Sequence, residues 1–288
     1  MPAPFTRALC GYRKKNGKPN MSDASDNLSV RLGTRFLEVA GAWHERPDQD
    51  GSDLERHVIT TLQAVRPDLE IKQSCSASDF SQYAHLNVFP AFRSGYSNSA
   101  KEVKALVSAV EALPDGPDRR RLITIAQHIG QSIDANAELV TKLVGLMPEE
   151  SLLKLDVVVG RPHDGELPEL ALALSAKWSL RTDRAQDCVS QGNKLVTQRR
   201  GRMPHFGVIT AETRPSMLKI LADGSGSVDW VYHLDLDSLA KAIDVEAKTR
   251  REPASWSPKK TFDRLMNQNR LRDFDDLVRV VESLPSKP

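Results

Sequence analysis

The second half of the chain alternates between short apolar runs and amphipathic segments. Residues 152–159 and 170–177 are almost continuously apolar, which is typical of strands that are buried on both faces. Residues 161–168 between them contain one glycine and two prolines, so they predict a turn that joins two paired core strands. Further elements are predicted as strands at residues 205–211 and 228–234, and as helices at residues 182–197, 238–247 and 261–284. Strands that alternate with helices favour an α/β fold.

The first half is mainly helical in its pattern. Residues 28–43 repeat apolar side chains at the spacing of one helical face. Further elements are predicted as helices at residues 54–65, 79–92, 100–113 and 119–146, and as a strand at residues 69–73. Because residues 95–150 carry no cluster of chemically reactive side chains, we expect a helical insertion or subdomain there. Residues 1–28 are polar and predict an arm or loop rather than a core element.

Length and composition limit the class of protein. A chain of 288 residues can hold one large or two small domains, and 40% hydrophobic with 27% charged residues is ordinary for a globular protein. The sequence contains neither an apolar run of the roughly 18 residues that span a bilayer nor an apolar signal core at its start, so we expect a cytoplasmic protein. Three widely spaced cysteines argue against both a disulfide framework and a zinc site.

The net charge of +2 conceals an uneven distribution. Basic residues gather at residues 13–18, 119–121, 181–202 and 248–251. A local basic excess is what a surface that follows a phosphate backbone requires, although a single basic run is more often a solvated face. The clusters therefore matter only in combination with other chemistry.

That chemistry begins with an acid and a lysine on the two predicted core strands. Asp156 and Lys177 lie 21 residues apart across a short connection, so both side chains can emerge on one face near the strand ends. Ser175 shares the face of Lys177, because side chains alternate along a strand. The alternative is that Asp156 caps a turn and Lys177 extends from a strand end into solvent.

An acid beside a lysine is suited to phosphodiester hydrolysis. Mg²⁺ prefers carboxylate and carbonyl oxygens, and it can polarise a phosphate and lower the pKa of an attacking water. A neighbouring lysine can hold the scissile phosphate. A further carboxylate is needed, and Glu55 at the start of a predicted helix is the candidate; an acid in this position is also a common partner of the helix dipole.

The sequence Arg181-Thr182-Asp183-Arg184 predicts base recognition. Arginine binds guanine O6 and N7 with two hydrogen bonds in the major groove, and an acidic side chain can accept a hydrogen bond from cytosine N4. The competing interpretation is a surface Arg–Asp ion pair at a helix N-terminus. A little further on, Arg199-Arg200-Gly201-Arg202 is typical of a loop that contacts phosphates.

These motifs, in this order, resemble type II restriction endonucleases of the NgoMIV kind, members of the PD-(D/E)xK nuclease superfamily. The run from Ser175 to Gln186 carries the resemblance most strongly. It extends over further short stretches, namely Phe5-Thr6, Leu54-Glu55, Gln82 to Leu86, Gly192, Leu195-Val196, Gly201-Arg202, Pro204-His205, Val208, Thr210 to Glu212 and Val231 to His233. It covers most of the chain outside residues 88–152.

The resemblance implies a restriction-endonuclease-like α/β core, in which helices flank a mixed central β-sheet and a helical insertion precedes the catalytic strand. It implies one endonuclease domain over residues 1–288, with a DNA-contacting arm and helix at residues 1–50 and a catalytic and recognition core at residues 151–235. The implied activity is Mg²⁺-dependent cleavage of double-stranded DNA at a palindrome that contains CCGG, with GCCGGC as the full site.

The resemblance also assigns roles to single residues. The implied catalytic residues are Asp156, Ser175, Lys177 and Glu55, and the implied metal ligands are Asp156, Glu55 and Ala176. The implied readers of the inner CCGG are Arg181, Asp183 and Arg184. Readers of the outer base pairs fall on Asp23, Ser25 and Gln49, and Arg202 is an expected DNA contact.

Three departures from the family pattern affect these expectations. Leu155 replaces the proline before the catalytic acid, and Gln191, fourteen residues after Lys177, stands where the family has a second acid. Relatives also have a long excursion between the two active-site strands that helps to build a tetramer, whereas only residues 160–169 lie there in this chain. We therefore expect at least a homodimer, since a palindrome requires two active sites related by a two-fold axis.

Gln191 leaves an alternative open. An amide can hold a metal or a water without supplying charge, so the chain is either an active restriction enzyme or a sequence-specific DNA-binding protein with weakened catalysis. A nuclease without sequence choice on the same scaffold is a third hypothesis. A cell that makes the active enzyme needs a cognate DNA methyltransferase.

Overall fold

A six-stranded mixed β-sheet forms the centre of the protein in the computed structural model, which describes residues 1–46, 51–88, 100–146, 153–223 and 226–286. The strands are β3 (Glu70–Ser76), β4 (Lys154–Arg161), β5 (Glu169–Lys177), β6 (His205–Thr210), β7 (Trp230–His233) and β8 (Leu271–Asp273). They lie in this order across the sheet. β3, β4 and β5 pair antiparallel, and β5 to β8 pair parallel. The predicted α/β class and mixed sheet are confirmed.

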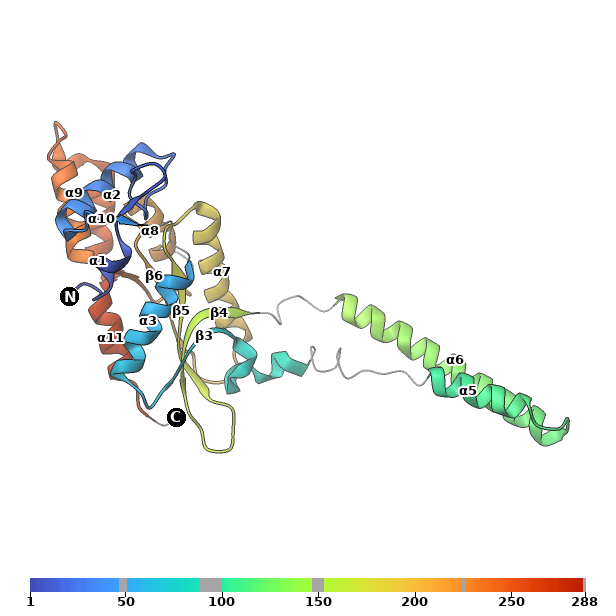
Figure 1. Cartoon of the computed structure of the whole chain (residues 1–288). Coiled ribbons are helices and arrows are strands. Elements are labelled where there is room, and N and C mark those ends of the chain that lie inside the picture. The colour runs from blue at the N-terminus through green and yellow to red at the C-terminus, as the bar shows by residue number, and fades with distance from the viewer. Residues whose placement is uncertain (47–50, 89–99, 147–152, 224–225, 287–288) are drawn as a thin grey trace. The chain divides into compact units, whose positions relative to one another are not determined.

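Helices cover the sheet because β4 and β5 are apolar on both faces. Val157, Val158 and Val159 are all fully buried, so neither face of β4 can be left to solvent. Figure 1 shows α3 (Gly51–Val65) and α7 (Thr182–Gln198) on opposite sides of the sheet. α7 approaches the sheet closely, since a Cβ at Gly192 would lie 2.8 Å from the Phe206 ring.

Shorter helices complete this body. α8 (Pro215–Ala222) lies against α7, and α11 (Phe274–Glu282) lies against α3 and β7. α9 (Leu236–Ala247) packs on α2 (Asn27–Ala40), and α10 (Ser257–Asn267) packs on α8 after a short 3-10 helix, η4 (Pro253–Ser255). None of the described helices combines the length and apolar character that crossing a membrane requires.

The N-terminal segment is part of the packed body, so the expectation of an arm or loop without core residues is wrong. It contains α1 (Thr6–Leu9) and β1 (Tyr12–Arg13), which pairs with β2 (Glu45–Arg46). Phe5, Leu9 and Met21 are buried, and the Ala3 N–H donates to the Leu234 carbonyl at 2.7 Å. These apolar side chains are scattered without helical or strand periodicity, which is why the sequence pattern did not indicate their burial.

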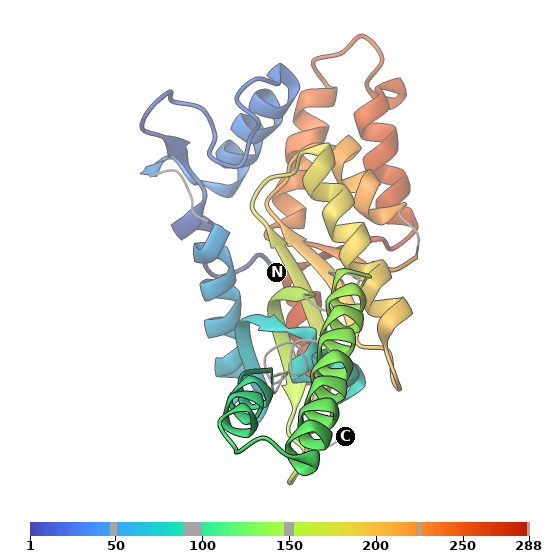
Figure 2. The ribbon, with the colours of Figure 1, turned by 90° about the vertical axis from the view of Figure 1, so that its right-hand side faces the viewer.

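A second compact unit comprises residues 85–151, and its described part contains a helical hairpin. α5 (Ala100–Glu111) packs against the longer α6 (Pro117–Leu146), with Val103, Val110 and Ala126 buried. The two helices run side by side in Figures 1 and 2. The intervening Pro-Asp-Gly-Pro sequence ends one helix and supplies a proline to the first turn of the next.

Two details of local structure differ from the expectation. The predicted helix over residues 79–92 is replaced by two 3-10 helices, η1 (Ala77–Asp79) and η2 (Ser81–Asn87), and its end lies outside the described residues. Ser76 and Asp79 form a reciprocal capping box around η1, which fixes a short turn in place of a long helix. α8 and β8 were not predicted, because eight and three residues are too short for a clear period.

Candidate active site

The pairing of β4 with β5 brings Asp156 to Ser175, Ala176 and Lys177. Val157 faces Leu174 in the register, so the next position outward places Asp156 beside the end of β5. Asp156 Oδ2 accepts hydrogen bonds from the Ala176 N–H at 2.9 Å, from Lys177 Nζ at 2.6 Å and from Ser175 Oγ at 3.2 Å. The carboxylate is therefore held in one orientation by three donors from the neighbouring strand.

Ser175 is a buried support of this carboxylate. Its side chain is 1% exposed, and the buried Cys188 Sγ of α7 donates to Ser175 Oγ at 3.4 Å. Burial raises the pKa of the Cys188 thiol, so the thiol stays protonated and can act as that donor. The predicted Ser175 and Lys177 thus lie on the same side of β5 but differ in access, since Lys177 remains about a quarter exposed.

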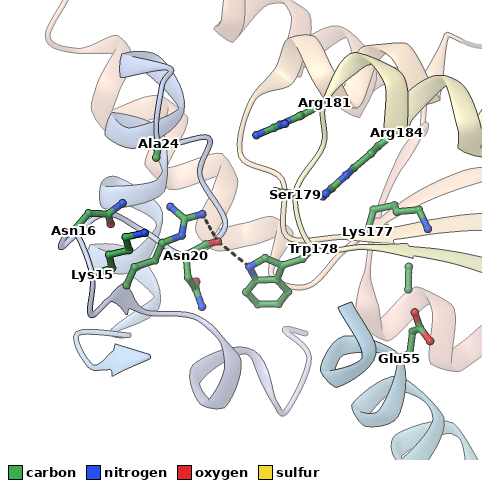
Figure 3. A pocket seen from close by; sticks show the side chains of 12 residues that line it. Lys15, Asn16, Asn20, Ala24, Glu55, Lys177, Trp178, Ser179, Arg181 and Arg184 are labelled. Carbon is green, nitrogen blue, oxygen red and sulfur yellow. Dashed lines mark hydrogen bonds between the residues drawn. The ribbon is translucent and has the colours of Figure 1, made fainter. Parts of the chain in front are cut away.

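An open pocket of about 870 Å³ lies beside Lys177 (Figure 3). Glu55, Ala176, Arg181 and Arg184 line it together with Lys177. The N-terminal segment lines its other side with Arg13, Lys15, Asn16, Asn20 and Ala24. Cationic side chains far outnumber the single carboxylate, so this pocket favours a polyanion.

Glu55 reaches the pocket from the first turns of α3. Gln73 Nε2 on β3 donates to Glu55 Oε2 at 2.7 Å and holds the carboxylate. A helix dipole alone would not require this contact between a helix and a strand, so the packing of α3 against β3 directs Glu55 towards the pocket that Lys177 and Ala176 line. The structure therefore brings the predicted early acid to the same pocket as the lysine.

The donors around this pocket fit a hard cation that retains much of its water. In the described part of the chain, no three His, Cys, Asp or Glu side chains come close enough to form a metal cage by themselves. Asp156 and Glu55 supply two carboxylates: Ala176 donates its N–H to Asp156 and lines the same pocket as Glu55 and Lys177. Mg²⁺ commonly binds through one or two carboxylates and several waters, which matches this donor set.

Gln191 on α7 contacts the backbone of β4. Its Nε2 donates to the Lys154 carbonyl at 2.5 Å, so the amide holds the beginning of β4. Gln191 lines a second pocket, of about 540 Å³, together with Ser175, Lys177 and Asp187. Asp187 was not predicted as a site residue, although its position one helical turn before Gln191 places both on one face of α7.

The predicted base readers lie where β5 leads into α7. Arg181 is the residue before the helix, and Arg184 is in the first turn; both line the large pocket and both are exposed. Asp183 is also exposed in the first turn but is not among the described residues that line the pocket. The structure therefore brings Arg181 and Arg184 together with Lys177, and it leaves Asp183 on the adjoining surface.

The N-terminal segment brings Asp23 and Ser25 to the same arginines. A smaller pocket, of about 360 Å³, is lined by Asp23, Ser25, Arg181 and Arg184 among others. Asp23 Oδ1 accepts from the Ser25 backbone N–H at 3.0 Å and from Ser25 Oγ at 2.7 Å. These bonds from Ser25, and then the charges of Arg214 and Arg181, lower the pKa of Asp23. Gln49 lies outside the described residues.

Arg202 is not brought to these pockets. It follows α7 and precedes β6, whose first residue, His205, lies opposite Leu172 of β5. Because β5 and β6 are parallel, Arg202 is near the start of β5, whereas Lys177 is at the end of that strand. The structure therefore does not bring Arg202 to the pockets that Arg181 and Arg184 line, and a DNA contact by Arg202 stays a prediction.

Comparisons with known proteins agree with this geometry. A family model described as NgoMIV restriction enzyme matches residues 38–280. The chain is also 31% identical, over 235 residues, to the type II restriction enzyme NgoMIV of Neisseria gonorrhoeae, and the match covers 78% of this chain and 72% of that enzyme. The resemblance found in the sequence is thus confirmed. The chain belongs to the NgoMIV restriction enzyme family and is a type II site-specific deoxyribonuclease.

Proposed function

We propose that the protein hydrolyses double-stranded DNA in a Mg²⁺-dependent reaction at a palindromic site that contains CCGG, with GCCGGC as the full site. One observation carries the proposal: Lys177, held against Asp156, shares a single open pocket with Arg181 and Arg184. A lysine that is paired with an acid, as phosphodiester chemistry requires, and two arginines suited to guanine therefore line the same pocket.

Asp156, Glu55 and the backbone of Ala176 would hold the metal ion. When bound, Mg²⁺ supplies a Lewis acid that polarises the phosphate and lowers the pKa of an attacking water. The chain supplies the orientation: the Ala176 N–H and Ser175 Oγ fix the Asp156 carboxylate. The Lys177 side chain is partly exposed. Its ammonium group can therefore hold a phosphate oxygen or orient the water.

Arg181 and Arg184 are the proposed readers of the guanines in CCGG. Both guanidinium groups are exposed at the N-terminal end of α7, beside the catalytic pair. Asp183 on the adjoining surface is suited to accept a hydrogen bond from cytosine N4. Asp23, Ser25 and Gln49 are the proposed readers of the outer base pair; the pocket that Asp23 and Ser25 share with both arginines supports two of these assignments.

A palindromic substrate also defines the partners. Two catalytic pockets related by a two-fold axis are needed to cut both strands, so we propose a homodimer as the smallest active form, with a tetramer as the next larger assembly. The proposed location is the cytoplasm, with a cognate DNA methyltransferase in the same cell to protect its own sites.

The second candidate is a sequence-specific DNA-binding protein with weakened catalysis. The observation that favours it is the contact of Gln191 Nε2 with the Lys154 carbonyl. The position that carries an acid in relatives is here an amide that is hydrogen-bonded to the backbone. A nuclease without sequence choice is the third hypothesis.

Digestion of plasmid DNA by the purified full-length protein with Mg²⁺ separates the three. Discrete fragments with ends at CCGG-containing sites are the expected result, and Lys177→Ala protein is the control for contaminating nuclease. Specific binding without cleavage would support the weakened form. Ends scattered over unrelated sequences would support the nuclease without sequence choice.

A further inference from the structure

Glu212 and Arg214 form a buried ion pair immediately after β6. Glu212 is fully buried and Arg214 is 6% exposed. Arg214 Nε donates to Glu212 Oε1 at 2.9 Å, and an Arg214 Nη donates to Glu212 Oε2 at 3.0 Å. A buried charged pair is costly unless its remaining donors and acceptors are satisfied, so the other contacts of these two side chains indicate their role.

The pair holds both backbone groups of Leu180. The Leu180 N–H donates to Glu212 Oε2 at 2.8 Å, and Arg214 Nη2 donates to the Leu180 carbonyl at 2.6 Å. Leu180 is the residue before Arg181, which precedes α7 without a side-chain cap of its own. The direction in which the chain enters the first turn of α7, and with it the position of Arg181, is therefore fixed by Glu212 and Arg214.

The free side of the Arg214 guanidinium faces the N-terminal segment. Arg214 Nη1 donates to Asp26 Oδ2 at 3.2 Å, and it lies 3.8 Å from Asp23 Oδ2. Asp26 uses its other oxygen to cap α2, because Oδ1 accepts from the backbone N–H groups of Leu28 and Ser29. One planar cation thus contacts the strand–helix junction before Arg181 and the segment that carries Asp23 and Ser25.

A second contact joins the same two segments. Trp178 Nε1 donates to the Asn20 carbonyl at 3.1 Å, and Arg13 donates to that carbonyl as well (Figure 3). These hydrogen bonds hold the N-terminal segment at Asn20, whereas Arg214 contacts the segment at Asp23 and Asp26. Loss of the Arg214 contacts would therefore leave Asp23 attached to α2 through the Ser29 hydroxyl, but it would remove the direct link from Asp23 and Asp26 to the junction before Arg181.

We infer that Glu212 and Arg214 are positioning residues that set the spacing between the outer reader segment, Asp23 to Ser25, and the inner reader Arg181, and that they thereby determine discrimination at the outer base pair of the DNA site. The inference rests on the proposed function. The fork of arginine is essential to it, since a lysine in this place keeps the charge but cannot bind Glu212, Leu180 and Asp26 together.

The test compares Arg214→Lys with wild type on DNA duplexes that contain GCCGGC, ACCGGT or GCATGC, using kcat/KM for cleavage. Arg214→Lys is expected to lower the preference for GCCGGC over ACCGGT at least tenfold, while Asp26→Asn, which can still cap α2, lowers it in the same direction. In Arg214→Lys, the preference for GCCGGC over GCATGC is expected to fall less than the preference for GCCGGC over ACCGGT, because rejection of GCATGC depends on Arg181 and Arg184 themselves. Arg264→Lys, at the surface pair with Asp223, is the matched control and leaves all ratios unchanged.

A purely structural role would lower the melting temperature and reduce kcat/KM on every duplex alike, with an unchanged outer-pair preference in both variants, and that result would overturn the inference. Hydrogen exchange in the free protein gives a reading that needs no cleavage. Arg214→Lys is expected to accelerate exchange at residues 22–26 and 180–184 but not in α10. If wild type cuts none of the duplexes, the proposed function fails, and unchanged exchange in Arg214→Lys would still separately refute the coupling.

Discussion

Lys177 Nζ lies 2.6 Å from Asp156 Oδ2, across the end of the β4–β5 pair. The two residues are 21 positions apart in sequence, and the antiparallel pairing of β4 with β5 brings them together. Both side chains remain partly exposed, and Lys177 lines an open pocket. The pair can therefore contact a substrate while its two members stay hydrogen-bonded to each other.

Replacement of Lys177 by alanine is predicted to abolish cleavage and to preserve binding. It removes the cation beside the scissile phosphate, and the loss of one such group typically costs roughly 100- to 1000-fold in rate. Cleavage is measured with Mg²⁺ and binding with Ca²⁺ by gel shift. Lys72→Ala is the control, since Lys72 makes an ion pair of the same length with Glu70 on an exposed part of β3. Equal activity of the two variants would exclude Lys177 from catalysis.

Arg181→Ala is predicted to weaken binding to CCGG-containing DNA by about 1 to 3 kcal/mol, the usual contribution of a two-bond contact to guanine. Binding to random DNA is expected to change little. Fluorescence anisotropy with the two DNAs measures the difference, and Arg202→Ala, near the start of β5, serves as the comparison. An equal loss on both DNAs would mean that Arg181 contacts only phosphate.

Gln191→Glu is predicted to lower the Mg²⁺ concentration for half-maximal cleavage roughly tenfold, because carboxylate ligands increase the affinity of a site for hard cations. Asp187→Asn, on the same pocket, is predicted to raise it. The Gln191 variant also loses a hydrogen bond to the Lys154 carbonyl, at a cost of about 1 kcal/mol of stability. Calorimetric titration with Mn²⁺ checks affinity independently of activity. Identical metal curves for all three proteins would show that neither residue acts near the metal.

The stability of the protein is predicted to fall as the pH drops from about 6.5 to about 4. Burial lowers the pKa of His233 to about 4, and its Nδ1 accepts from the Asp235 N–H at 3.1 Å, so the folded state holds a neutral ring. The unfolded chain binds a proton at a higher pH, and it is therefore favoured increasingly below about 6.5. The predicted loss is about 3 kcal/mol in the free energy of unfolding, measured by urea titration. His233→Gln is expected to flatten this dependence; an unchanged slope would assign it to other groups.

Features that depend on local sequence patterns could be predicted, and features that depend on long-range packing could not. That Asp156, Ser175 and Lys177 lie together can be expected from the sequence, because strand alternation is local and the two runs are strongly apolar. The position of Glu55 depended on the packing of α3 against β3, which no local pattern encodes. Residues far apart in sequence, such as Arg214 and Asp26, meet only in the folded chain, and a buried arginine is indistinguishable in sequence from a solvated one.

Neither the burial of the N-terminal segment nor the position of Arg202 follows from a local pattern. The N-terminal segment looked like a polar arm, yet Phe5 and Met21 are buried, because isolated apolar residues show no period. Arg181 and Arg202 are close in sequence, but the 17 residues of α7 separate them and carry the chain from the end of β5 back to its start. A helix rises about 1.5 Å per residue, so these two arginines do not line one pocket.

Sequencing of the fragment ends from genomic DNA digested with the full-length protein and Mg²⁺ identifies the cleavage site directly. We expect the ends to map to one palindrome, with CCGG at its centre and a G·C pair on each side. Lys177→Ala protein prepared in parallel should yield none of these ends. Ends that share no sequence, or that share a palindrome without CCGG, would show that the protein is not a CCGG-specific endonuclease.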